Sequence, residues 1–152
     1  MEKEQTFVLI KPDGVQRRII GRIIQRFEDK GFSMVAMKML IPNQELLQKH
    51  YEELMFKPFF PCLICYMLSG PVIAMIWQGK DVVRQIRSML GEGRNPIEQK
   101  PGTVRGDYAL ELQRNLIHGS DSCESAQKEI NLWFNIKEIV DWKPSDLNWV
   151  CE

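Results

Sequence analysis

The sequence lacks an excess of charge of either sign. Its 152 residues include 20 Lys and Arg against 20 Asp and Glu, so the formal net charge is zero. Proteins that bind nucleic acids or anionic membranes usually carry a positive balance or a large basic patch. The zero balance argues against constitutive binding of either partner, although it leaves room for a local basic patch.

Export and membrane insertion also lack support in the sequence. The first six residues contain no apolar core of a secretory signal, so we expect a cytoplasmic protein. Residues 58–79 carry no charge and are numerous enough to suggest a membrane span, but a proline and the Ser69-Gly70-Pro71 break interrupt them. Two buried strands joined by a turn, Leu63–Leu68 and Val72–Trp77, are the expectation instead.

Cysteine is scarce, and its spacing gives one candidate motif. Of four cysteines, Cys62 and Cys65 form a C-x-x-C, a pattern found in metal and redox sites. In the strand expected here, residues three apart point to opposite faces. No second C-x-x-C and no nearby histidine completes a zinc set. We therefore expect reduced thiols without a shared ligand.

Hydrophobic periodicity predicts strands interleaved with helices. The expected strands are Thr6–Ile10, Phe32–Ile41, Leu63–Leu68, Val72–Trp77 and Leu116–His118. The expected helices run from Arg18 to a stop at Gly31, onward from a cap at Asn43, over Asp81–Leu90 and over Cys123–Phe134. With four core strands, this order predicts one α+β domain over residues 1–152, a ferredoxin-like βαββαβ sandwich. Its four-stranded antiparallel sheet would carry helices on one face. A long loop, 91–106, and an aromatic tail, 141–152, complete the chain, and the tail would pack on the domain or on a neighbouring subunit.

One histidine, His118, lies where a strand is expected to give way to a helix. It follows two aliphatic residues and precedes Gly119 and two helix-capping candidates, Ser120 and Asp121. Such a junction exposes a side chain near unpaired backbone N–H groups, which suits anionic ligands. A single histidine is more often a surface or core residue, so its function depends on what else converges on it.

The run from Asn115 to Asp121, Asn-Leu-Ile-His-Gly-Ser-Asp, resembles the active-site signature of nucleoside diphosphate kinases. Further motifs of that family occur in the same order: Lys11-Pro12-Asp13-Gly14-Val15, Tyr51, Pro58-Phe59-Phe60, Ser69-Gly70-Pro71, Lys100-Pro101-Gly102-Thr103 and Arg105-Gly106-Asp107. The likeness covers nearly the whole chain. It implies transfer of the γ-phosphate of a nucleoside triphosphate, typically ATP, to a nucleoside diphosphate. The reaction would follow a ping-pong cycle through a phosphohistidine on Nδ1 of His118.

The resemblance assigns catalytic roles to three side chains. Neutral imidazole can attack phosphorus at physiological pH, which suits His118. Glu129 would hold the ring and stabilise the charge that the ring gains. The alternative, a surface glutamate, fits less well because Glu129 borders the apolar stripe of the last helix. Ser120 would hydrogen-bond Glu129 or the phosphate, or would only contribute to the turn before that helix.

The resemblance also implies a nucleotide-binding set. Lys11, Arg87 and Arg105 would neutralise the phosphates, with forked contacts from the guanidinium groups. Tyr51 would donate its hydroxyl to phosphate, although spacing alone fits a core tyrosine. Asn115, together with Lys11, would contact the ribose hydroxyls.

The base is expected to bind by stacking, and the metal ion is expected to bind through the nucleotide. Phe59 would stack on the base with Leu112 across from it, and stacking without base-edge hydrogen bonds tolerates any base. Mg²⁺ would arrive with the nucleotide, bridging phosphate oxygens through a largely water-filled shell. The sequence shows no protein cage for the ion, so no residue is named as a metal ligand. The resemblance implies a homo-oligomer, and the long tail favours a hexamer.

One segment departs from the family pattern. The family has Gly-Glu-Thr or Gly-Ala-Thr before Asn-Pro, and that threonine touches phosphate, whereas this chain reads Gly91-Glu92-Gly93-Arg94-Asn95-Pro96. Arg94 would either supply a phosphate contact or be exposed.

Two other functions are possible on the same scaffold: a nucleic-acid-binding or protein-binding module, and a protein-histidine kinase that reuses His118. Balanced charge and the complete catalytic set disfavour the binding module as the main role.

Overall fold

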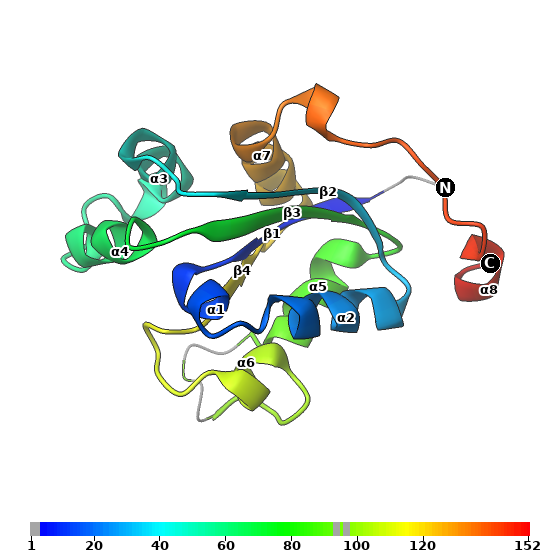
Figure 1. Cartoon of the computed structure of the whole chain (residues 1–152), viewed down its shortest axis with the longest axis horizontal. Helices are drawn as coiled ribbons and strands as arrows, with labels where there is room; N and C mark the ends of the chain where they lie inside the picture. The colour runs from blue at the N-terminus through cyan, green and yellow to red at the C-terminus, as the bar shows by residue number, and fades with distance from the viewer. Residues whose placement is uncertain (1–3, 93–94, 96–97) are drawn as a thin grey trace.

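The computed structural model describes residues 4–92, 95 and 98–152. Its regular elements are β1 (Gln5–Ile10), α1 (Pro12–Gln16), α2 (Ile20–Lys30), β2 (Ser33–Leu40), α3 (Gln44–His50), η1 (Glu52–Leu54), α4 (Phe60–Met67), β3 (Val72–Gln78), α5 (Val82–Leu90), α6 (Val104–Tyr108), β4 (Ile117–Gly119), α7 (Cys123–Trp133), η3 (Ile136–Glu138) and α8 (Leu147–Val150). Figure 1 labels the α-helices and the strands. No helix in these described ranges is long and apolar enough to cross a membrane.

The four strands form one antiparallel sheet in the order β2-β3-β1-β4. The inner strands β1 and β3 are buried almost throughout, because both of their faces are covered. The edge strand β4 is short and pairs with the carboxyl end of β1, where Leu9 lies opposite His118. This is the expected ferredoxin-like topology, with β1 joined through α2 to β2 and β3 inserted between them.

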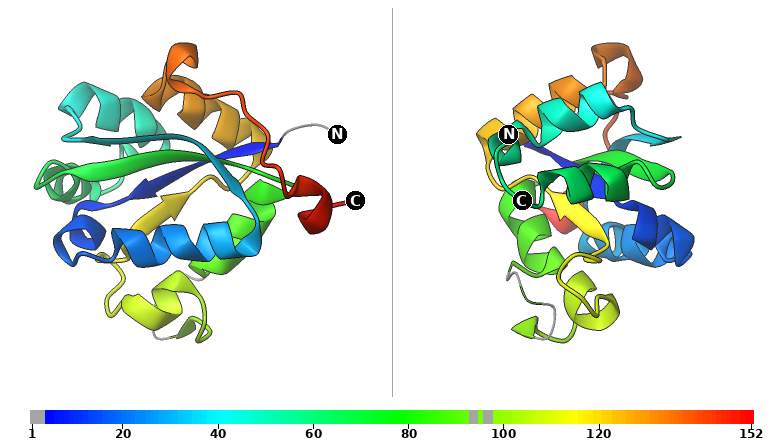
Figure 2. Two further views of the ribbon diagram at one scale, coloured as in Figure 1. Left: turned by 45° about the vertical axis from the view of Figure 1, so that its right-hand side comes forward. Right: turned by 90° about the vertical axis from the view of Figure 1, so that its left-hand side faces the viewer.

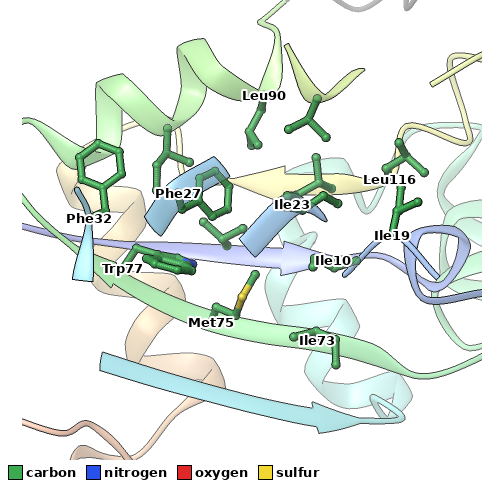
Figure 3. Close-up of a cluster of buried hydrophobic side chains, with 14 of the residues drawn as sticks. Ile10, Ile19, Ile23, Phe27, Phe32, Ile73, Met75, Trp77, Leu90 and Leu116 are labelled. Carbon is green, nitrogen blue, oxygen red and sulfur yellow. The ribbon is translucent and has the colours of Figure 1, made fainter. Parts of the chain in front are cut away.

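Helices cover both faces of the sheet, which corrects the expectation of one covered face (Figure 1). Alternate residues of β1 project to opposite sides, so Val8 and Ile10 enter one core and Phe7 and Leu9 enter the other. The first core lies under α2 and α5 and contains Trp77 packed edge-on to Phe27 (Figure 3). The second lies under α3, α4 and α7. Central strands that are apolar on both sides need a helical layer on each.

The segment expected as strand Leu63–Leu68 is instead helix α4. Short apolar runs cannot be told from buried helix by hydrophobicity alone. Pro61 lies in the first turn, where the missing N–H of proline costs nothing. Ile64 and Met67, three residues apart, are the buried positions, which is helical spacing.

The residues predicted to end α2 and to cap α3 are confirmed. Gly31 ends α2 with a φ of +98°, and the Asn43 side chain accepts a hydrogen bond from the Leu46 amide at 2.8 Å. The cap of α7 is Ser122, which accepts from the amide of Ser125, and neither expected candidate, Ser120 nor Asp121, occupies that position. The expected loop 91–106 ends earlier than predicted, because α6 begins at Val104.

The C-terminal tail packs along the domain, as one of the two expected alternatives. The indole N–H of Trp142 donates to the Met34 carbonyl at 2.9 Å. The amide of Val140 donates to the Val35 carbonyl at 2.8 Å. Helix α8 then lies at the far end of α2 (Figure 2), where Val150 contacts the Gly31 position.

Candidate active site

His118 lies on the edge strand β4, and side chains from the helices on both faces of the sheet lie close to it. The His118 ring lies on the side of Phe7, with ring centroids 6.1 Å apart, and so faces the layer of α3 and α7. From the opposite layer, Arg87 on α5 donates to the carbonyl of Gly119 at 3.3 Å. The strand-to-helix junction predicted from the sequence is therefore present, and it collects groups from both faces of the sheet.

The carboxylate of Glu129 fixes the orientation of His118. His118 Nε2 lies 2.5 Å from Glu129 Oε2, and the Glu129 residue is buried. Because a carboxylate accepts, Nε2 carries the proton and the lone pair lies on Nδ1. No hydrogen bond to Nδ1 is found in the described part of the chain, and the His118 side chain is 25% exposed. The ring thus presents a nucleophilic nitrogen to approaching ligands.

His50 packs against the His118 ring, a contact that the sequence did not reveal. Its ring lies edge-on to His118 with centroids 4.9 Å apart, and its Nδ1 accepts a hydrogen bond from the Trp133 indole N–H at 3.0 Å. Burial, with the nearby His118 second, lowers the pKa of His50 to about 2. His50 is therefore neutral. The sequence offered no signal for this contact beyond the fact that His50 and His118 are its only two histidines.

Tyr51 packs against His50 and has a hydroxyl without a hydrogen-bond partner among the described residues. Its ring packs edge-on to His50 at 4.6 Å, and its hydroxyl is buried. Burial, and then the charge of Glu129, raise the pKa of this phenol. A buried hydroxyl without a partner is uncommon and costs free energy, so it indicates a missing acceptor.

Lys11 and Asn115 meet beside the end of β1. Lys11 Nζ donates to Asn115 Oδ1 at 2.7 Å. Burial and, second, the charge of Arg105 lower the pKa of Lys11 to about 8, while the charge of Asp13 opposes the shift. This ammonium group lacks a carboxylate at hydrogen-bond distance in the described chain, so an anionic ligand would stabilise it.

Arg105 is held by backbone rather than exposed. Its guanidinium donates to the carbonyls of Gly91 and Ile117, each at 2.6 Å, and to that of Asn115 at 3.4 Å. Burial and the charge of Arg87 lower the pKa of Arg105 to about 10. Arg105 therefore ties α6 to β4 and adds positive charge next to His118.

The remaining predicted residues are Ser120, Phe59 and Leu112, together with the segment that departs from the family pattern. The hydroxyl of the buried Ser120 donates to the Phe7 carbonyl at 3.4 Å rather than to Glu129, a contact that fits the alternative of a role in the turn. Phe59, which precedes α4, and Leu112, between α6 and β4, are about half exposed, at 47% and 54%. Gly93 and Arg94, where the sequence departs from the family pattern, lie outside the described residues.

Comparison with known proteins settles the family. The family model described as nucleoside diphosphate kinase matches residues 4–139. The chain belongs to the nucleoside diphosphate kinase family. A nucleoside diphosphate kinase B from Bos taurus is 56% identical over 149 residues, covering 98% of this chain and 97% of the relative. One from Eremothecium gossypii is 53% identical over 152 residues, with both chains fully covered.

Solved structures agree with this assignment. A halophilic nucleoside diphosphate kinase from Halobacterium salinarum, in complex with CDP, superposes with a TM-score of 0.96 at 46% identity. The match covers 99% of this chain and all of the other. As a nucleoside diphosphate kinase, the chain is a phosphotransferase that acts on nucleoside di- and triphosphates.

Proposed function

We propose that Nδ1 of His118 carries the phosphate in a ping-pong cycle. Its lone pair attacks the γ-phosphorus of a nucleoside triphosphate, the bond to the β-phosphate oxygen breaks, and the nucleoside diphosphate leaves. A second nucleoside diphosphate then takes the phosphoryl group in the reverse step. The observation that carries the proposal is the 2.5 Å bond between His118 Nε2 and Glu129, because it leaves Nδ1 unprotonated and stabilises the charge that the ring gains.

Three cations and a phenol would hold the phosphates. Phosphoryl transfer depends mainly on position and charge, and Lys11, Arg87 and Arg105 gather positive charge around β4. Arg105 is already bonded to carbonyls, so its contribution is electrostatic and positional. Tyr51 would donate its unpaired hydroxyl to a phosphate oxygen.

The nucleoside would bind through stacking and ribose contacts. Phe59 and Leu112 expose the apolar surface that a base needs, and stacking of this kind does not discriminate between bases. Asn115, whose side chain is anchored to Lys11, would accept from a ribose hydroxyl. These assignments predict similar use of purine and pyrimidine nucleotides.

The donor set near His118 fits a metal ion that is held by the nucleotide. Among the described residues, the one cluster of three potential ligands is His50, His118 and Glu129, and its carboxylate is committed to His118. Lys11, Arg87 and Arg105 add cationic charge around β4. Mg²⁺ would therefore be coordinated by phosphate oxygens and water, and when bound it neutralises phosphate charge.

We also propose a single-domain, cytoplasmic protein that assembles as a homo-oligomer, with a hexamer favoured. The edge strand β2 supports assembly, since Met37, Met39 and Ile41 at its end are more than half exposed. The tail offers further apolar surface at Trp149, which is 91% exposed. Analytical ultracentrifugation of the full chain tests the subunit number.

The direct test is phosphorylation with γ-labelled ATP. Wild-type protein should acquire an acid-labile label that added GDP discharges, and His118→Ala should acquire none. Because the chain has only two histidines, His50→Gln serves as the matched control and should still be labelled. Acid-labile label that persists in His118→Ala would place the nucleophile elsewhere.

A further inference from the structure

Helix α4 carries a pair of cysteines that phosphate transfer does not use. In a strand, Cys62 and Cys65 would point to opposite faces, which argues against a shared ligand. The structure removes the strand premise of that argument, because both residues lie in α4. Residues three apart in a helix are neighbours on one face, one turn apart.

The two thiols lie on the outward stripe of α4. Cys62 and Cys65 are both unoxidised and exposed. The opposite side of the helix, with Ile64 and Met67, packs into the core under the sheet. Helix α4 lies at the outer edge of the molecule, with its outer side uncovered by other elements (Figures 1 and 2). Both sulfur atoms are therefore accessible to the same ligand.

The number of available ligands limits the chemistry. In the described ranges, neither cysteine belongs to a cluster of three His, Cys, Asp or Glu side chains. A structural zinc site needs four protein ligands, so two thiolates alone do not make one. Soft thiolates select Cu(I), which is stable with two sulfur ligands.

The helix spacing favours an ion over a disulfide. Cβ atoms three residues apart in a helix are about 5–6 Å apart. A disulfide requires a Cβ separation of about 3.5–4.5 Å, so it would have to contract the helix. A metal ion about 2.3 Å from each sulfur bridges the wider spacing without that change.

We propose that Cys62 and Cys65 form a two-thiolate site for one soft monovalent cation of the Cu(I) class. Binding converts two thiols and one Cu⁺ into a bis-thiolate complex with a charge of −1, and releases two protons to solvent. No electron is transferred, so no oxidant is needed. The site is separate from His118 and begins three residues after Phe59, which precedes α4.

The test is competition for Cu(I) under anaerobic, reducing conditions. Full-length protein is titrated into the Cu(I) complex of a colorimetric chelator, and the loss of the chelator's absorbance measures transfer. Wild-type protein should withdraw one equivalent with an affinity at least tenfold above that of Cys62→Ser or Cys65→Ser. Cys123→Ser, which removes an exposed thiol from α7, should bind as the wild type does.

A thiol-matched variant tests the geometry itself. Cys65→Ser combined with Ser69→Cys keeps four thiols but separates the pair by seven residues and places the second thiol beyond the last residue of α4. Ser69 is exposed and follows α4, but its Oγ donates to the Tyr66 carbonyl at 2.6 Å, so urea unfolding of this variant is measured alongside to check that the fold tolerates the loss of that bond. This variant should lose the high-affinity binding of one equivalent of Cu(I). Retention of it, or equal binding by wild type and Cys65→Ser, would overturn the two-thiolate site.

Discussion

Asp13 anchors the strained backbone of Leu116, two residues before His118. Asp13 Oδ2 accepts the Leu116 amide at 3.1 Å, and the Leu116 carbonyl accepts the Lys11 amide at 2.8 Å. Leu116 is fully buried with a φ of +74°, a conformation that costs a non-glycine residue about 1–3 kcal/mol. A Cβ at Gly14 would lie 2.7 Å from Ile10 Cγ2 and 3.1 Å from the same carbonyl, so glycine permits the close approach of α1.

Asp13→Ala should therefore disturb the position of His118 from a distance. The Leu116 amide would be left buried and unpaired, which costs about 1–3 kcal/mol in the free energy of unfolding. A displacement of about 1 Å at a reacting group can cost about 10²-fold in rate. We expect kcat to fall by about 10- to 100-fold, as measured by steady-state kinetics alongside urea unfolding.

Tyr66→Phe is the matched control for Asp13. The Tyr66 hydroxyl donates to the other carboxylate oxygen, Oδ1, so its removal leaves the bond to Leu116 in place. This variant should keep most of kcat. Equal losses in the two variants would show that Asp13 acts through Tyr66 rather than through Leu116.

The features that sequence predicted were local or carried by motifs. Gly31 and Asn43 mark helix ends by their own chemistry, and the run around His118 places the nucleophile. Helix α4 was missed because its short apolar run has no diagnostic period. The Asp13–Leu116 and His50–Trp133 bonds join residues 103 and 83 positions apart. Such pairs are created by folding, so no local pattern predicts them.

Glu129→Gln should slow phosphorylation of His118 more than it weakens nucleotide binding. A hydrogen bond to a charged group contributes about 1.5–3 kcal/mol, which corresponds to about 10- to 100-fold in rate. Rapid-quench measurement of acid-labile label should show this decrease. Glu124→Gln, on the exposed first turn of the same helix, should leave the rate unchanged. A normal rate in Glu129→Gln would remove the carboxylate from the mechanism.

His50 should make the protein less stable in acid. Its pKa is about 2 in the folded protein and about 6.5 when unfolded, so the unfolded state binds an extra proton below pH 6.5. The free energy of unfolding should therefore fall as pH decreases through 6.5, by about 1.4 kcal/mol per pH unit from this group. Urea unfolding between pH 7 and pH 5, at fixed protein concentration, measures the slope. His50→Gln should reduce the slope of the free energy of unfolding against pH by the amount that one bound proton contributes. His118→Gln should retain the contribution of His50.

Lys11 should make nucleotide affinity fall at alkaline pH. With a pKa of about 8 in the free protein, its ammonium group loses its proton as pH rises above 8, well below the ordinary value near 10.5. Bound phosphates favour the charged form, so binding above pH 8 must recover that proton, and Kd should rise up to about tenfold per pH unit. Calorimetric binding of a nucleoside diphosphate from pH 7 to pH 9, below the pKa of about 10 of Arg105, measures the slope and the proton uptake. Lys11→Arg supplies the matched control, since a guanidinium stays charged throughout this range. It should bind with a flat pH profile, and an identical slope in the two proteins would assign the titration to another group.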